Sequence, residues 1–211
     1  MPKQTPRQNS TVDVRGKVAR EAAALLYFGL EKEFRQAKLK AAETLGVHVL
    51  PSNLEVALEL DRFAEETEGT ARGERLVQMR RDALKFMQLL EPFCPLLIGS
   101  VWRGNIRRGS DIDIETYYDD PQKVLTHLTA RDVKIVGAEQ MRTTEHGNPI
   151  SSMHIHVESS CRHPVEIVVR GFEEKGRQRV CDIFGDQIRG LTLSELENLL
   201  KTNPAQRFLP K

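Results

Sequence analysis

The chain has few cysteines and no long apolar run, and these absences exclude several classes of protein. Three cysteines, Cys94, Cys161 and Cys181, lie far apart in 211 residues and form no C-x-x-C pair. An odd, scattered set favours neither a disulfide framework nor a zinc ribbon, and it suits a reducing compartment. No apolar run approaches the length of a membrane span, and the polar N-terminus lacks the apolar region of a signal peptide. We therefore expect a soluble, cytoplasmic protein with no membrane partner.

The sequence also lacks an excess of charge of either sign. It contains 31 basic and 30 acidic residues, for a formal net charge of +1. Such a chain has no overall attraction for nucleic acid, so any contact with it must use local clusters. One cluster consists of Arg72, Arg80, Arg81 and Lys85, which would form the basic side of one helix. This pattern fits either a solvated face or a face that binds phosphate or nucleic acid.

The order of helical and strand patterns predicts two parts. Residues 1–14 are polar and predict a loose tail, whereas residues 15–91 show the apolar spacing of a helical module. Residues 92–203 change to short apolar or alternating segments and end in a helix, and residues 204–211 are a second tail. We expect an α+β fold in which an N-terminal helical module accompanies a mixed or antiparallel sheet and a C-terminal helix.

Several local patterns make separate predictions. SNLE at residues 52–55 and TLSE at residues 192–195 are capping boxes, in which a hydroxyl and a glutamate satisfy each other's free backbone N–H groups, so each opens a helix. Alternating residues at 152–158 and 165–169 predict a hairpin. The polar residues 141–148 predict a loop, and the charged residues 173–184 predict a weakly helical segment.

The acidic end of residues 97–115, LIGSVWRGNIRRGSDIDIE, indicates a metal site. Asp111, Asp113 and Glu115 alternate with isoleucines, so a strand would place all three carboxylates on one face. Like charges aligned on one face repel, and a bound cation is the simplest reason for such a row. We assign Asp111 and Asp113 to this site and expect Glu115 to be an exposed strand residue beside it.

The beginning of the same stretch indicates a phosphate site. Gly99 and Ser100 follow an apolar strand, where a glycine lets backbone N–H groups approach an anion and the serine hydroxyl adds a donor. Arg103, Arg107 and Arg108 lie within eight residues of Ser100 and could neutralise a triphosphate. Donors for phosphate beside acids for a hard cation are what a metal–nucleotide complex requires.

A third carboxylate would complete the metal site, and Glu166 is the best candidate. It lies on the polar side of the strand at residues 165–169, which we expect in the same sheet as Asp111 and Asp113. A charged residue in mid-strand is disfavoured unless it faces solvent or a site. Glu158 is a weaker rival for this role.

His154 and His156 form an H-x-H pattern on one face of the same predicted hairpin. Two histidines at this spacing can bind a transition metal. Polar residues on the outer face of a hairpin are the more ordinary interpretation, and the sequence does not decide between the two.

The motif resembles the nucleotidyltransferase superfamily related to DNA polymerase beta. That family has Gly-Ser, a spacer of about ten residues and then Asp-x-Asp, and here residues 101–110 separate Gly-Ser from Asp-Ile-Asp. The fuller family pattern is matched by GSVWRG at residues 99–104 and SDID at residues 110–113. PVEIVVR at residues 164–170 resembles the strand that bears the family's third acid. The matches cover about residues 94–170 and are similar to stand-alone nucleotidyltransferase-domain proteins and to the catalytic part of archaeal CCA-adding enzymes.

This resemblance implies an enzyme of the polymerase beta-like fold that moves NMP from an NTP to a hydroxyl acceptor and releases pyrophosphate. Mg²⁺, or Mn²⁺ in its place, would be the cofactor in a two-metal mechanism, and ATP is the expected nucleotide. The implied catalytic and metal-binding residues are Asp111, Asp113 and Glu166. The implied nucleotide-binding residues are Gly99, Ser100, Arg103, Gly104 and Ser110.

The acceptor and the partners are left open by the sequence. The acceptor could be RNA, a protein or a small molecule, because only the N-terminal helices and one C-terminal helix are present beside the catalytic motif. One variant is an antitoxin-type enzyme that adds AMP to a partner protein. A different class is a non-catalytic nucleotide- or RNA-binding module, which would use the basic helix. The helical module would serve as a homodimer surface or as an arm that binds the acceptor.

Overall fold

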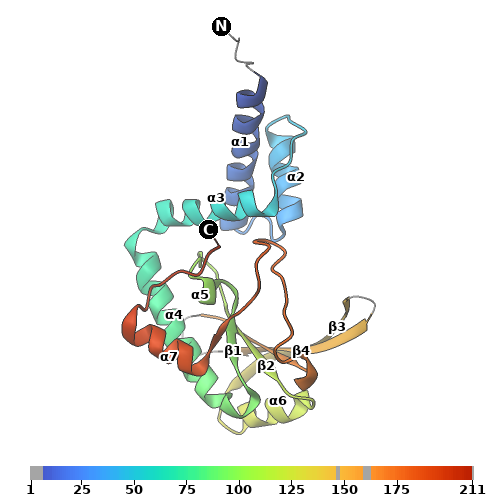
Figure 1. Cartoon of the computed structure of the whole chain (residues 1–211), viewed down its shortest axis with the longest axis vertical. Helices are drawn as coiled ribbons and strands as arrows, with labels where there is room; N and C mark the ends of the chain where they lie inside the picture. The colour runs from blue at the N-terminus through green and yellow to red at the C-terminus, as the bar shows by residue number, and fades with distance from the viewer. Residues whose placement is uncertain (1–6, 146–147, 159–162, 211) are drawn as a thin grey trace. The chain divides into compact units, whose positions relative to one another are not determined.

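The computed structural model describes residues 7–145, 148–158 and 163–210 (Figure 1). Within these residues the chain forms seven α-helices and a six-stranded mixed sheet, which confirms the α+β class. The chain divides into two compact units, one comprising Met1–Arg72 with Cys181–Asp186 and the other Gly73–Val180 with Gln187–Lys211. No helix within the described ranges combines the length and apolar character that crossing a membrane requires.

The first unit contains α1 (Arg7–Tyr27), α2 (Phe34–Thr44) and α3 (Asn53–Glu68), drawn from blue to cyan in Figure 1. Its core is rich in small side chains, which let helices approach closely: Val18, Ala19, Ala22, Leu25, Leu26, Ala37, Ala41, Ala42 and Val56. Helix α1 already begins at Arg7, so the predicted loose tail is helical from there onward, and residues 1–6 lie outside the described residues.

The capping box predicted at the start of α3 is confirmed. The Ser52 hydroxyl accepts from the Glu55 N–H at 3.2 Å, and the Ser52 N–H donates to Glu55 Oε2 at 2.6 Å. The second box also forms, with Thr192 opening α7 (Leu193–Thr202) and Glu195 accepting from the Thr192 N–H at 2.8 Å. In both places four residues of sequence were enough to locate the start of a helix.

The division between the units falls inside α4 (Thr70–Leu89), whereas we predicted a helical module reaching residue 91. The reason is that the apolar side of α4 is buried in the core of the second unit, where it meets strand residues such as Leu97 and Ile114. The residues of α4 in this core are Leu76, Met79, Ala83, Phe86 and Met87. Helix α4 therefore supports the sheet.

The sheet of the second unit has the strand order β3-β4-β5-β2-β1-β6. Its strands are β1 (Leu96–Ile98), β2 (Ile112–Tyr117), β3 (Lys134–Glu145), β4 (Asn148–Glu158), β5 (Val165–Arg170) and β6 (Leu191–Thr192). Strands β2 and β5 run parallel and the other neighbours run antiparallel. The predicted hairpin of residues 152–158 with 165–169 is confirmed as the antiparallel pair β4–β5.

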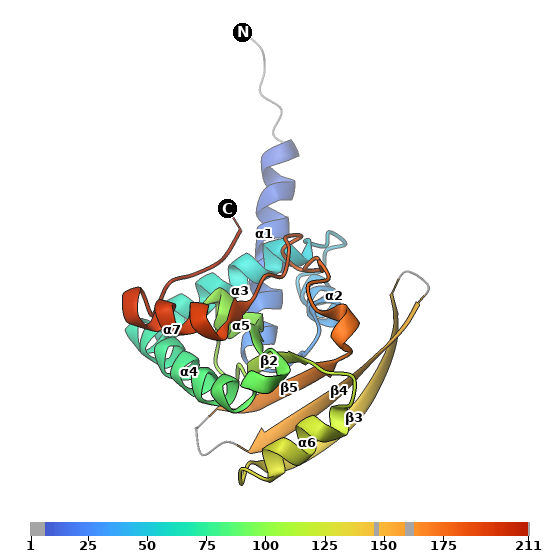
Figure 2. The same cartoon turned by 60° about the horizontal axis from the view of Figure 1, so that its bottom comes forward.

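Strands β3 and β4 form a long hairpin, with α6 (Pro121–Thr129) in front of it in Figure 2. The prediction of a loop at residues 141–148 is wrong for its described part, because β3 continues to Glu145 and β4 begins at Asn148. Residues 146–147 lie outside the described residues. Backbone pairing between two neighbouring strands does not require apolar side chains, so the polar composition of this segment gave no strand signal.

The two faces of the sheet differ in chemistry. The face that joins the core with α4, α6 and α7 carries buried aliphatic side chains, which are Ile112, Ile114, Ile155, Val157, Val165, Ile167 and Val169. Because side chains alternate along a strand, the residues between them point to the other face. Asp113, His154 and Glu166 are on that second face, and the rest of the site is built around them.

Candidate functional site

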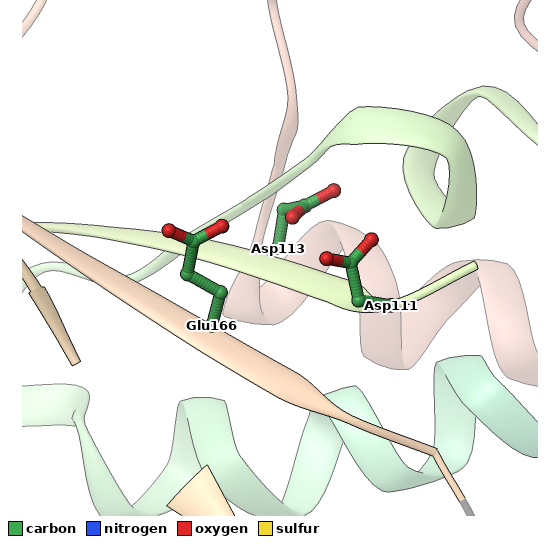
Figure 3. Close-up of side chains that lie close together, drawn as sticks. All are labelled: Asp111, Asp113 and Glu166. Carbon is green, nitrogen blue, oxygen red and sulfur yellow. The ribbon is translucent and has the colours of Figure 1, made fainter. Parts of the chain in front are cut away.

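The pairing of β2 with β5 brings the three predicted metal ligands together. Asp113 lies directly across from Glu166 in the parallel register, and Asp111 immediately precedes β2. One carboxylate oxygen from each of the three residues lies within 4.8 Å of the others. Figure 3 shows the three carboxylates on the same side of the two strands. The rival candidate, Glu158, instead forms an ion pair with Lys134.

The electrostatics of this cluster favour a cation. Burial raises the pKa of Asp113 to about 7, and the charges of Asp111, Glu166 and Glu115 add to the rise. A carboxyl in this position holds a proton or needs a nearby positive charge at neutral pH. All three donor groups are carboxylates, which are the ligands that hard cations such as Mg²⁺ and Mn²⁺ prefer. The cluster therefore fits the predicted metal.

Gly99 is essential to the shape of the cluster. Ile98 pairs with Asp113 across β1 and β2, so the residue that follows Ile98 lies beside the Asp113 carboxylate. A Cβ atom on Gly99 would be 2.0 Å from Asp113 Oδ2, and the backbone has φ +70°. Only glycine satisfies both conditions without strain. The Gly-Ser pair of the motif thus lets the backbone approach the acidic site closely.

Replacing Gly99 with alanine is expected to displace the Asp113 carboxylate and to weaken Mn²⁺ binding at least tenfold, on the scale of losses from disturbed ligand positioning. The matched control is Gly109→Ala, because Gly109 has a similar φ of +79° and nothing within 4 Å of its Cβ position. Both variants carry similar backbone strain, of roughly 1 kcal/mol. Mn²⁺ titration monitored by electron paramagnetic resonance would show the difference. Equal affinities for the two variants would contradict the assigned role of Gly99.

Two residues that we assigned to the nucleotide lie against the C-terminal segment. Arg103 is 4% exposed, and its guanidinium stacks 4.5 Å from the Trp102 ring and donates to the Phe208 carbonyl. The Phe208 N–H in turn donates to the Arg103 carbonyl at 2.8 Å. A Cβ on Gly104 would be 3.1 Å from the Arg207 side chain. Arg103 therefore holds the C-terminal segment, and the phosphate roles of Arg103 and Gly104 stay predictions.

Ser100 and Ser110 lie at the two ends of the motif. Ser100 is the second residue of α5 (Gly99–Arg103), so it stays next to Gly99 and the acidic cluster. Ser110 closes the following loop, because its hydroxyl accepts from the Arg107 N–H at 2.9 Å. Burial lowers the pKa of Arg107, and the charge of Asp111 opposes that shift. The charge of Asp111 in the acidic cluster therefore acts on Arg107, which is one of the predicted phosphate-binding arginines.

The basic side predicted for α4 is not a continuous surface. Arg80 is fully buried and donates to the carbonyls of Val101, Trp102 and Pro204 at 3.1, 2.8 and 2.8 Å. Arg72 is 3% exposed and pairs with acidic residues of α3. Both interpretations of this pattern, as a solvated face or as a nucleic-acid face, are wrong for these two arginines. Arg80 instead anchors the C-terminal end of α5.

Glu115 is also buried, with 1% exposure, although we expected it to be exposed. Its carboxylate accepts from Arg170 at 2.9 Å, from Arg179 at 2.7 Å and from the Tyr117 hydroxyl at 3.0 Å. Burial raises the pKa of the Glu115 carboxyl but the bonds and charges of Arg179 and Arg170 outweigh it, so the net shift is downward. The positive charges of Arg170 and Arg179 thus neutralise Glu115, which has a structural role and is not part of the three-carboxylate cluster.

Arg179 comes from the segment that we predicted to be weakly helical. That prediction is wrong, because the helical part is only a 3₁₀ turn at Phe172–Glu174. The rest of residues 173–184 is irregular. No local pattern indicates that Arg179 pairs with a carboxylate 64 residues away.

His154 is the polar neighbour that sequence reasoning left undecided. Its Nδ1 atom lies 2.6 Å from Glu166 Oε1, and its Nε2 atom lies 3.1 Å from the Ser152 hydroxyl. His156 instead lies 3.7 Å from Glu139 and is 44% exposed. The H-x-H pattern therefore separates into one histidine that contacts the acidic cluster and one that does not.

No family model, curated protein or solved structure matches this chain. The superfamily membership and the polymerase beta-like type of fold therefore stay predictions, carried by the motif and by the geometry of the acidic cluster.

Proposed function

We propose that this protein is a metal-dependent nucleotidyltransferase that moves NMP from an NTP to a hydroxyl acceptor and releases pyrophosphate. One observation carries the proposal: three carboxylates from two neighbouring strands offer oxygens within 4.8 Å of one another, beside a glycine whose Cβ would collide with one of them. Both halves of the Gly-Ser…Asp-x-Asp motif thus meet at one point of the fold.

In the proposed reaction the acceptor hydroxyl loses its proton to solvent and its oxygen attacks the α-phosphate, the bond between the α- and β-phosphates breaks, and pyrophosphate leaves. Asp111, Asp113 and Glu166 would hold Mg²⁺ or Mn²⁺, which supplies charge neutralisation for the phosphates and lowers the pKa of the acceptor hydroxyl. The backbone at Gly99 and the Ser100 hydroxyl would hold the terminal phosphates. The rate acceleration would come from positioning and charge neutralisation, without a covalent enzyme intermediate. We assign the supporting positive charge to Arg107 in place of Arg103.

The nucleic-acid-binding alternative loses its main support. It required an exposed basic side of α4, but Arg72 and Arg80 of that set are buried and occupied by protein acceptors. A module that only binds nucleic acid also has no use for a carboxylate cluster that repels phosphate. Transfer to RNA, to a protein or to a small molecule remains compatible with the proposed chemistry.

The proposal is tested by incubating the protein with each α-³²P-labelled NTP, Mg²⁺ and a cell extract. We expect label to appear on one acceptor class, and the double variant Asp111→Asn/Asp113→Asn to reduce transfer at least 10³-fold because the carboxylates act through their charge in the transition state. A labelled protein band would identify the AMP-adding variant. Transfer that survives in the double variant would overturn the proposal.

A further inference from the structure

Glu166 is held by a neighbouring strand through a short polar chain. His154 on β4 and Glu166 on β5 point to the same face of the sheet, one diagonal step apart in the antiparallel register. His154 Nδ1 lies 2.6 Å from Glu166 Oε1, and the two side chains are 19% and 23% exposed. On its other side, His154 Nε2 lies 3.1 Å from the hydroxyl of Ser152.

This arrangement fixes the tautomer of the histidine. An ionised carboxylate only accepts hydrogen bonds, so the Nδ1 atom facing Glu166 carries a proton. The Ser152 hydroxyl can then donate to Nε2, which completes the polar pairing of the ring. One oxygen of Glu166 accepts from His154, and the other is left for a cation. A glutamate is longer than an aspartate and has one more rotatable bond, so it loses more freedom when held in one orientation.

We propose that His154, oriented by Ser152, is a positioning residue that holds Glu166 in its metal-binding orientation. The inference rests on the proposed function, since it takes Glu166 to be a metal ligand. Partners behind a metal ligand fix its orientation, and their loss commonly lowers metal affinity by 10- to 100-fold. By fixing the orientation of the longer Glu166 side chain, His154 lets it act as a metal ligand beside Asp111 and Asp113.

His156 provides a matched control on the same strand. It pairs directly with Glu166 in the strand register, yet its ring lies 3.7 Å from Glu139 rather than against Glu166. The two histidines therefore share a strand, a face and a residue type and differ in their contact with the metal ligand. Removing His156 leaves the contact between His154 and Glu166 in place.

The test is Mn²⁺ binding to the full chain, measured by electron paramagnetic resonance of free Mn²⁺. We expect His154→Ala to weaken binding by roughly 10- to 100-fold. His154→Asn, whose amide nitrogen stands near the position of Nδ1, and His156→Ala should each stay within about twofold of wild type. Urea unfolding of the same variants would show that His154→Ala is folded, and rescue by asparagine separates positioning from a general packing role.

A second comparison tests whether His154 acts through Glu166. In a Glu166→Gln background, the further change His154→Ala should cause no additional loss of Mn²⁺ affinity. An equal loss in both backgrounds, or unchanged affinity in His154→Ala alone, would overturn the inference while leaving the proposed function standing. A wild-type protein that binds no Mn²⁺ would overturn both together.

Discussion

Asp113→Asn is expected to stabilise the metal-free protein at pH 8 and to abolish nucleotidyl transfer. In the wild type, burial and the charges of Asp111, Glu166 and Glu115 raise the pKa of Asp113 from 3.8 to about 7. A shift of this size corresponds to about 4 kcal/mol, as an upper, order-of-magnitude value. Asparagine has a similar shape and carries no charge, so it removes the repulsion from the folded state together with a metal ligand.

The pH dependence of this effect has a defined sign. Between pH 4 and pH 7 the folded wild type retains a proton on Asp113 that the unfolded chain loses. The wild-type stability that this proton provides is therefore complete below about pH 4 and is lost as the pH rises to about 7. The advantage of Asp113→Asn should grow through this window and level off above it.

Urea unfolding in EDTA at several pH values between 4.5 and 8 measures this difference. Asp132→Asn is the control, because Asp132 is exposed in the same unit and asparagine tolerates its φ of +59°. Added Mn²⁺ should stabilise the wild type at pH 8 but have little effect on Asp113→Asn. A constant difference between wild type and Asp113→Asn across the pH range would contradict the electrostatic account.

Arg80→Met is expected to lower the free energy of unfolding by about 3–5 kcal/mol, the scale for leaving three buried carbonyls without their hydrogen-bond donor. Arg80 is fully buried, and burial lowers its pKa to about 10, so it remains charged at neutral pH. Methionine fills much of the same space but leaves the carbonyls of Val101, Trp102 and Pro204 without this donor. Unpaired buried carbonyls account for the loss.

Arg81→Met is the matched control for this prediction, because Arg81 is the next residue of α4 and is exposed. Its stability should stay within about 0.5 kcal/mol of wild type, as is usual at surface positions. Urea unfolding of both variants provides the comparison. Equal stability of Arg80→Met and Arg81→Met would show that the carbonyl contacts do not hold α5 and the C-terminal segment.

The sequence predicted those features that depend on contacts between near neighbours in the chain or on the alternation of side chains along a strand. The capping boxes at Ser52 and Thr192 open helices as expected, since their hydrogen bonds join residues three apart. Glu166 was identified because alternation placed it on the polar side of a strand in the same sheet as Asp113. The ladder between β2 and β5 puts those two residues directly opposite each other.

Two misses, the burial of Glu115 and that of Arg80, have a different physical origin, which is pairing between distant parts of the chain. Glu115 is buried because Arg179 reaches it from an irregular segment. Arg80 resembled a surface residue because helical spacing cannot indicate which carbonyls will face a long side chain. The bond between Arg179 and Glu115 spans 64 residues, and the bond between Arg80 and the Pro204 carbonyl spans 124.

The most direct test of the account is anomalous diffraction from crystals grown with Mn²⁺ and a non-hydrolysable NTP analogue. We predict an Mn²⁺ peak coordinated by Asp111, Asp113 and Glu166, with the terminal phosphates against the backbone of Gly99 and the hydroxyl of Ser100. A triphosphate bound elsewhere, or no metal among these three carboxylates at saturating Mn²⁺, would contradict the account.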